Sequence, residues 1–202
     1  MIFGRVDEVD GHYIATNFVV ATVPIESLYI TSNSAARASV TNPLGPLRVK
    51  TDWRSIGLGY ARTWVPALGL ALPLLSLLSG RMVFETLLVT IASLALAAFA
   101  YRAGKLPDDE KARLRLLGTV TGLRIDPTKL TAATRAVKRD SLGDLMDKGG
   151  IPMTPDGILE VIDDIPIPAM ALVYGYACYA GDEPAWRDCA EIIYLRHAQS
   201  EQ

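Results

Sequence analysis

Residues 63–101 read TWVPALGLALPLLSLLSGRMVFETLLVTIASLALAAFAY, and only Arg81 and Glu85 among these thirty-nine residues are charged. A helix needs roughly 20 apolar residues to cross the ~30 Å hydrocarbon layer of a bilayer. Residues 79–81, Ser-Gly-Arg, divide the stretch into two runs of about that length. The sequence therefore predicts a transmembrane helical hairpin with one span on each side of this turn.

Each predicted span contains residues suited to close packing. The first span, 63–79, contains Pro66, Gly69 and Pro73. Proline within a membrane helix frees a backbone carbonyl, which a neighbouring helix can satisfy. The second span, 82–101, is rich in alanine, and small side chains let helix backbones approach closely. We expect the two spans to pack on each other, with the alanine-rich face available to other subunits.

The positive charges around the hairpin predict its orientation. Seven basic residues flank its outer ends: Arg54, Arg62, Arg102, Lys105, Lys111, Arg113 and Arg115. The connecting turn contains Arg81 alone. Because Lys and Arg are retained on the cytoplasmic side, we expect an integral protein of a bacterial inner membrane with both termini in the cytoplasm. The chain begins MIFGRVDE, with acidic residues where a signal peptide has basic ones, so the hairpin should act as its own insertion signal.

The segment before the hairpin, residues 1–51, is predicted to be a β-rich cytoplasmic module. Asp10-Gly11 is a strong hairpin-turn signal, and residues 13–31 are dense in β-branched and aromatic side chains. Pro24 should break that run into two strands, and residues 47–51 alternate as a short further strand. We expect a small sheet of about four strands.

An interfacial helix is predicted over residues 52–62, with Asp52 as its N-cap. Tryptophan and tyrosine favour the headgroup level of a bilayer, and arginine reaches towards phosphate from nearby positions. The residues expected at the membrane interface are Trp53, Tyr60, Arg62 and Trp64.

Residues 105–202 are predicted to be an all-helical cytoplasmic module. The helices expected are 108–117 (ended by Gly118), a continuous helix from Pro127 towards Met146, 155–163, 167–180 and 185–199. The run 167–180 is apolar nearly all round but too short to cross a bilayer, so it should be the buried central helix. The segment ALVYGYACYAGDEPAWRDCAEIIYLRHA resembles one tetratricopeptide unit, but no second copy follows at the period of about 34 residues, and no function is carried over. The predicted fold class is an α+β membrane protein.

Composition and motifs give no sign of catalysis. The net charge of −2 provides no basic footprint for nucleic acid, and zinc-helix, nucleophile-elbow and phosphate-loop motifs are missing from the sequence. Cys178 and Cys189 should be free, buried thiols. His12, with acidic neighbours, fits a solvated hairpin tip better than a metal site. We therefore predict no catalytic residue, cofactor or metal.

Two groups of charged residues have candidate roles. Arg81 and Glu85 lie one helical turn apart near the shallow end of a span, and we expect a structural ion pair. On the last helix, burial of Trp186, Cys189 and Ile193 would leave another set towards solvent. These candidate partner-binding residues are Arg187, Glu191, Tyr194 and Arg196.

The leading functional prediction is a membrane-anchored interaction or structural protein, an accessory subunit or adaptor of a larger membrane assembly. Its expected partners are the lipid bilayer and other membrane-protein subunits or further copies of itself, and not nucleic acid. Two alternatives remain open: a membrane-bound enzyme with a site between its two cytoplasmic modules, and a homo-oligomeric channel or transporter component.

Overall fold

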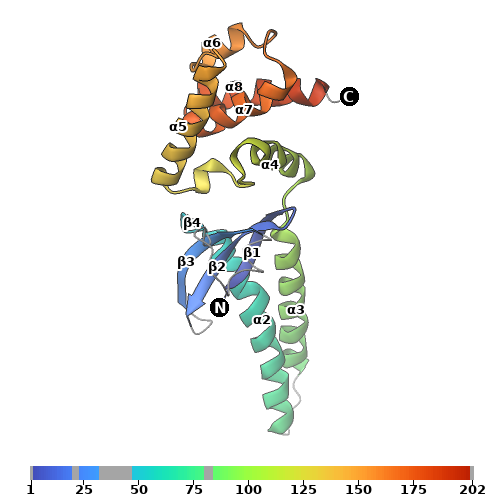
Figure 1. Cartoon of the computed structure of the whole chain (residues 1–202). Helices are drawn as coiled ribbons and strands as arrows, with labels where there is room; N and C mark the ends of the chain where they lie inside the picture. The colour runs from blue at the N-terminus through green and yellow to red at the C-terminus, as the bar shows by residue number, and fades with distance from the viewer. Residues whose placement is uncertain (1, 20–22, 32–46, 80–83, 201–202) are drawn as a thin grey trace. The chain divides into compact units, whose positions relative to one another are not determined.

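The computed structural model describes residues 2–19, 23–31, 47–79 and 84–200 of an α+β protein (Figure 1). The chain forms two compact units, Met1–Leu106 and Pro107–Gln202. The first unit combines a sheet with two long apolar helices, and the second is helical.

The sheet has four antiparallel strands in the order β1-β2-β3-β4, and the number of strands agrees with the sequence prediction. The strands are β1 (Ile2–Val9), β2 (His12–Val19), β3 (Val23–Ile30) and β4 (Leu47–Val49). Asp10 and Gly11, with φ of 47° and 81°, join β1 to β2. Positive φ at both positions is the geometry of a type I′ turn, whose twist matches that of the strands, so the predicted hairpin is confirmed. Pro24 is the second residue of β3, so the break between strands precedes it rather than occurring at it.

One face of the sheet packs on the first turns of α2 (Trp53–Leu78). The Thr16 hydroxyl donates to the Ser55 hydroxyl (2.9 Å), which donates to the Gly4 carbonyl (2.7 Å). Gly4 has a φ of 72°, and a Cβ there would lie 2.0 Å from the Ser55 carbonyl oxygen, so only glycine fits. Phe18 meets the Tyr60 ring edge-on, with centroids 5.5 Å apart. The sheet and α2 therefore share one interior.

The two long helices, α2 and α3 (Phe84–Ala103), lie side by side (Figure 1). Asp52 caps α2 by accepting from the Ser55 N–H at 2.9 Å. The predicted interfacial helix and first span are one continuous helix of 26 residues, and α3 has 20. At a rise of 1.5 Å per residue these are roughly 39 and 30 Å long. Both are long and apolar enough to span a membrane.

A close contact at Gly69 joins α2 to α3. A Cβ at Gly69 would lie 2.4 Å from the Ser93 Cβ, so the backbone of α2 approaches α3 only because this residue is glycine. Pro73 has no N–H to offer the Gly69 carbonyl four residues earlier. The Thr90 hydroxyl of α3 lies 2.7 Å from that carbonyl and donates to it. The neighbouring helix thus satisfies a carbonyl that proline frees.

The second unit is built around α7. Its elements are α4 (Asp108–Thr121), the 3₁₀ turn η1 (Pro127–Lys129), α5 (Ala132–Lys148), α6 (Pro155–Glu160), α7 (Ile167–Ala180) and α8 (Pro184–Ser200). Helix α7 packs against α4, α5 and α8, and Val173 and Tyr179 on it are fully buried. The predicted central helix is therefore confirmed.

Two predicted helix boundaries in this unit are wrong. Helix α4 runs past Gly118 to Thr121 and ends at Gly122, which has a φ of 71° and donates its N–H to the Gly118 carbonyl. The expected continuous helix from Pro127 breaks at Leu130, which is extended and fully buried. Thr131 then caps α5 by accepting from the Thr134 N–H. Burial of Leu130 at the break explains why helix propensity alone did not locate it.

Candidate functional site

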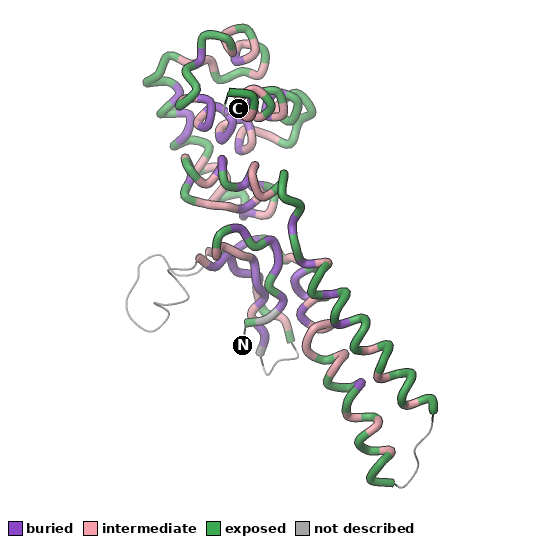
Figure 2. The backbone as a smooth tube through the Cα atoms, turned by 90° about the vertical axis from the view of Figure 1, so that its right-hand side faces the viewer, coloured by how far each residue is buried: buried purple, intermediate pink, exposed green. Residues whose placement is uncertain are grey.

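The α2–α3 pair exposes many large apolar side chains. Exposed residues occur along the length of both helices (Figure 2). The set comprises Leu68, Leu70, Leu72, Leu74, Leu75, Leu77, Leu78, Phe84, Leu87, Leu88, Val89, Ile91, Leu94, Leu96 and Phe99. Removing one half-exposed side chain of this size from water is favourable by roughly 1 kcal/mol. Removing the whole set from water is therefore favourable by on the order of 10 kcal/mol. That free energy is comparable with the whole free energy of unfolding of an ordinary domain. An apolar environment around α2 and α3 would therefore contribute as much free energy as the folding of such a domain.

The four residues predicted for the membrane interface divide into two pairs. Trp53 is 76% exposed and Trp64 is also exposed. Tyr60 is half-buried against Phe18. Arg62 donates from Nε (3.1 Å) and Nη2 (2.8 Å) to the Ala100 carbonyl.

Arginines from α2 hold the C-terminal end of α3. Besides Ala100, Arg62 donates to the Arg5 carbonyl of β1, and Arg54 donates to the Ala103 carbonyl. Arg54 is also paired with the buried Asp7 at 3.2 Å. The last carbonyls of a helix have no partner within the helix, so these guanidinium groups complete the end of α3 and join it to the sheet.

Arg81 lies outside the described residues, so its predicted ion pair with Glu85 stays a prediction. Glu85 is exposed in the first turn of α3. At a helix N-terminus a carboxylate also interacts favourably with the helix dipole.

The four predicted partner-binding residues lie on α8, and three of them contact other parts of the second unit. Glu191 accepts two hydrogen bonds from Arg113 of α4, one of them at 2.8 Å. The Arg113 guanidinium also lies over the Tyr194 ring, 4.4 Å from its centroid. Arg196 is paired with Asp163. Arg187 is exposed.

These contacts change the ionisation of the groups involved. The hydrogen bond with Arg113 holds the pKa of the Glu191 carboxyl below its usual value, and the same bond raises the pKa of Arg113. Burial raises the pKa of the Cys178 thiol to about 12. Cys178 is therefore a neutral thiol at neutral pH and a weak nucleophile.

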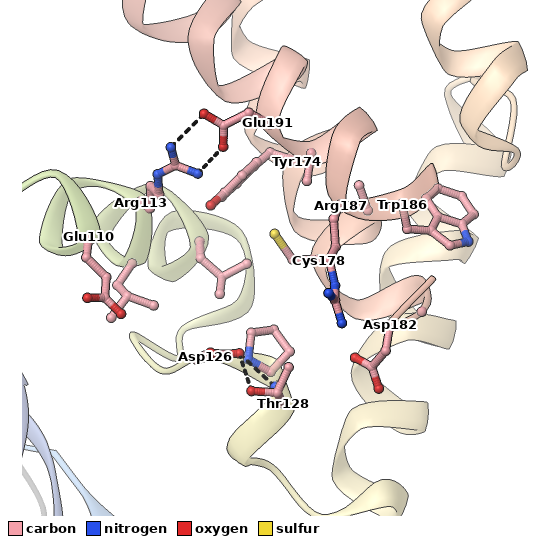
Figure 3. A pocket seen from close by; sticks show the side chains of 16 residues that line it. Glu110, Arg113, Asp126, Thr128, Tyr174, Cys178, Asp182, Trp186, Arg187 and Glu191 are labelled. Atoms are coloured by element: carbon pink, nitrogen blue, oxygen red, sulfur yellow. Dashed lines mark hydrogen bonds and ion pairs between the residues drawn. The ribbon is translucent and has the colours of Figure 1, made fainter. Parts of the chain in front are cut away.

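Beside this cluster the second unit contains a cavity of about 320 Å³ (Figure 3). Its walls come from α4, η1, α7 and α8, and they include Leu114, Leu117, Cys178, Trp186 and Arg187. The volume is at the lower end of the range of small-molecule sites. Sequence reasoning missed the cavity because its walls come from segments far apart, as Arg113 and Glu191 illustrate by their separation of 78 residues.

Within residues 2–19, 23–31, 47–79 and 84–200, no group of three or more acidic, histidine or cysteine side chains is placed to hold a metal ion. His12 instead contacts Tyr29, with Nδ1 2.7 Å from the phenolic oxygen, and Glu8 is paired with Arg5.

Comparison of the chain with protein-family models, curated proteins and solved structures found no match.

Proposed function

We propose that this chain is a membrane-anchored interaction protein whose α2–α3 hairpin spans a bilayer and which serves as an accessory subunit or adaptor of a membrane assembly. The observation that carries the proposal is the apolar surface of the hairpin, which is mostly exposed along both helices. The hydrocarbon of a lipid bilayer would surround both helices and remove this apolar surface from water.

The interior of the hairpin also suits a bilayer. Backbone polar groups in hydrocarbon need partners within the protein, because water cannot supply them. Thr90 supplies such a partner to the Gly69 carbonyl that Pro73 leaves open. The Gly69–Ser93 approach resembles the small-residue contacts by which membrane helices associate.

For orientation we propose that both termini lie in the cytoplasm of a bacterial cell. The seven basic residues beyond the outer ends of the hairpin support this arrangement, against Arg81 alone at the turn. Under this proposal Trp53 and Trp64 lie near the headgroups, where exposed tryptophan is favoured.

For partner binding we propose the face of α8 that carries Arg187, Glu191, Tyr194 and Arg196. Large aromatic and arginine side chains dominate the energies of protein interfaces. Arg113 contacts both Glu191 and Tyr194, and these contacts restrict the two α8 side chains before binding, which lowers the entropy lost on binding.

The membrane part of the proposal is tested by substitution of an exposed leucine near the middle of α3. Leu94→Arg places a charge at the centre of the span, at a cost of about 3 kcal/mol for insertion. We expect wild-type protein to stay with membranes during alkaline carbonate extraction and the Leu94→Arg variant to be largely lost from them. Val137→Arg, which changes an exposed apolar residue of α5 in the same way, is the matched control and should stay in the membrane. Release of wild-type protein by carbonate would contradict the proposal.

The partner-binding part is tested in native membranes by mild-detergent purification. Tyr194→Ala combined with Arg196→Ala should release the proteins that copurify with the wild type. Asp163→Ala breaks the same internal ion pair as Arg196→Ala but leaves the Tyr194 and Arg196 side chains in place. This control variant should therefore retain the copurifying proteins. Retention of every partner by the double variant would show that the interface lies elsewhere. Recovery of this chain alone, as an oligomer, would favour the homo-oligomeric alternative.

A further inference from the structure

The cavity of the second unit combines an apolar wall with a charged rim. Leu114, Leu117 and Ala177 are buried side chains that contribute the apolar wall. Trp186 also lines the cavity and is half-buried. A site of this composition accommodates a compact apolar group and orients it through few polar contacts.

Most charged side chains around the cavity already have partners. Arg113 is held by Glu191. Asp182 accepts from Arg135 at 2.9 and 3.0 Å. Asp126 accepts from the N–H and the hydroxyl of Thr128, both at 2.8 Å. These contacts neutralise or occupy the groups, so they contribute little to holding a ligand.

Among the described residues that line the cavity, the exceptions are Glu110 and Arg187, and Arg187 is the cation of the two. Its guanidinium extends from α8 into the cavity, in the space between Asp182 and the turn that contains Asp126 and Thr128 (Figure 3). Among the residues that the structure describes, it makes no hydrogen bond or ion pair. A guanidinium carries five N–H donors in a planar fork that matches a carboxylate.

We propose that this cavity binds an organic monocarboxylate with a compact apolar body, its carboxylate on Arg187 and its body against Leu114, Leu117 and Ala177. A single negative charge is favoured over two, because the exposed carboxylate of Glu110 also lines the cavity and repels a dianion such as a phosphate ester more strongly than a monoanion. The volume of about 320 Å³ limits the body to roughly the size of one aromatic ring with a short chain. The carboxylate can belong to a free acid or to an acidic side chain beside an apolar one on a partner protein.

The test uses Trp186 as the reporter, in full-length protein with Trp53→Phe and Trp64→Phe, held in lipid nanodiscs. Titration with 3-phenylpropionate should give a saturable change in fluorescence. Arg187→Gln should weaken binding tenfold or more. Arg139→Gln, an equal loss of charge on α5 outside this cavity, should leave binding unchanged.

Matched ligands separate the two halves of the proposed site. 3-Phenylpropanamide retains the apolar body without the charge, acetate retains the charge without the body, and phenyl phosphate carries a second charge. Each should bind at least tenfold more weakly than 3-phenylpropionate. Equal binding of the amide, or unchanged binding by the Arg187→Gln variant, would overturn the proposal.

The source of the carboxylate is distinguished by competition. An acetylated, amidated peptide with one internal Glu-Phe pair presents the same groups from a protein chain. Displacement of 3-phenylpropionate by a lower concentration of this peptide would assign the site to a partner protein, and the reverse order would assign it to a free acid. Binding by neither ligand would overturn the proposal.

This site is independent of the proposed membrane anchor because the cavity lies wholly within the second unit. If carbonate releases the protein, the same titration is carried out in buffer, so failure of either proposal leaves the other open to its own test.

Discussion

The ion pair between Arg113 and Glu191 should make the stability of the second unit depend on pH. The pKa of Glu191 is lower in the folded than in the unfolded chain. Its contribution is therefore complete above the unfolded value of about 4.3 and is lost as the pH falls through the folded value. We expect Glu191→Gln to cost about 0.5–1 kcal/mol at pH 7, because the pair is partly exposed, and much less at pH 3.

Chemical unfolding of both proteins at the two pH values measures this difference. Glu160→Gln removes an exposed carboxylate at the end of α6 and serves as the control, with little effect on stability at pH 7. A cost for Glu191→Gln that stays constant between pH 7 and pH 3 would mean that the ion pair contributes nothing to stability.

Two glycines of α2 should respond in opposite directions to the same substitution. Gly69→Ala brings a methyl group against Ser93, and relieving the overlap should destabilise the helix pair by about 1–3 kcal/mol. Gly57 has open space around its Cα, so Gly57→Ala should stabilise α2 by about 0.5–1 kcal/mol through helix propensity. Thermal unfolding in one detergent compares the two. A neutral Gly69→Ala would show that the helices do not approach each other at this point.

At the scale of the helix pair, a double-mutant cycle between Pro73 and Thr90 tests whether Thr90 satisfies the Gly69 carbonyl that Pro73 frees. Thr90→Val removes the hydroxyl that donates to Gly69 and should weaken the pairing of α2 with α3 by about 1 kcal/mol. Pro73→Ala restores an N–H within α2, so Thr90→Val should cost less in that background. Thr90→Ser, which retains the hydroxyl, is the control. Equal costs in both backgrounds, measured by reversible unfolding in mixed micelles, would show that proline and threonine act independently.

The elements that the sequence predicted well are those whose signals are local. The Asp10-Gly11 turn, the apolar runs of α2 and α3, and the apolar α7 each carry their signal within a short window. The misplaced boundary at Leu130 depends on tertiary packing, since this residue is extended and fully buried where the chain leaves helical geometry. The boundary at Gly118 was misplaced because the left-handed C-cap is the next glycine, Gly122.

The candidate site was predictable only in part, for the same reason. The pattern of α8 indicated that Cys189 and Ile193 face inward, and both are buried. It could not indicate that Glu191 contacts Arg113 or that Arg196 contacts Asp163, because those partners come from distant segments. Spacing along one helix gives the direction of a side chain but not its partner.

At the scale of the whole molecule, the proposed orientation predicts which positions reagents can reach. With Cys178 and Cys189 replaced by Ala, a cysteine at Ser79 should react with a membrane-impermeant maleimide added outside intact cells. Cysteines at Lys50 or Gln199 should react only after the cells are opened, because both termini are expected in the cytoplasm. Reaction at Lys50 or Gln199 in intact cells would reverse the orientation.

The bond between Thr90 and the Gly69 carbonyl also has a consequence for biosynthesis. A ribosome completes α2 before Thr90 exists, and an unsatisfied carbonyl in hydrocarbon costs several kcal/mol. If the hairpin inserts into a bilayer, α2 should stay in the translocon until α3 has been synthesised, and the two helices should then move into the lipid as a pair. Nascent chains stalled before Thr90 should integrate better with Pro73→Ala than with proline, and chains stalled after Thr90 should integrate equally well with either residue. Equal integration at the shorter length would mean that α2 enters the membrane on its own.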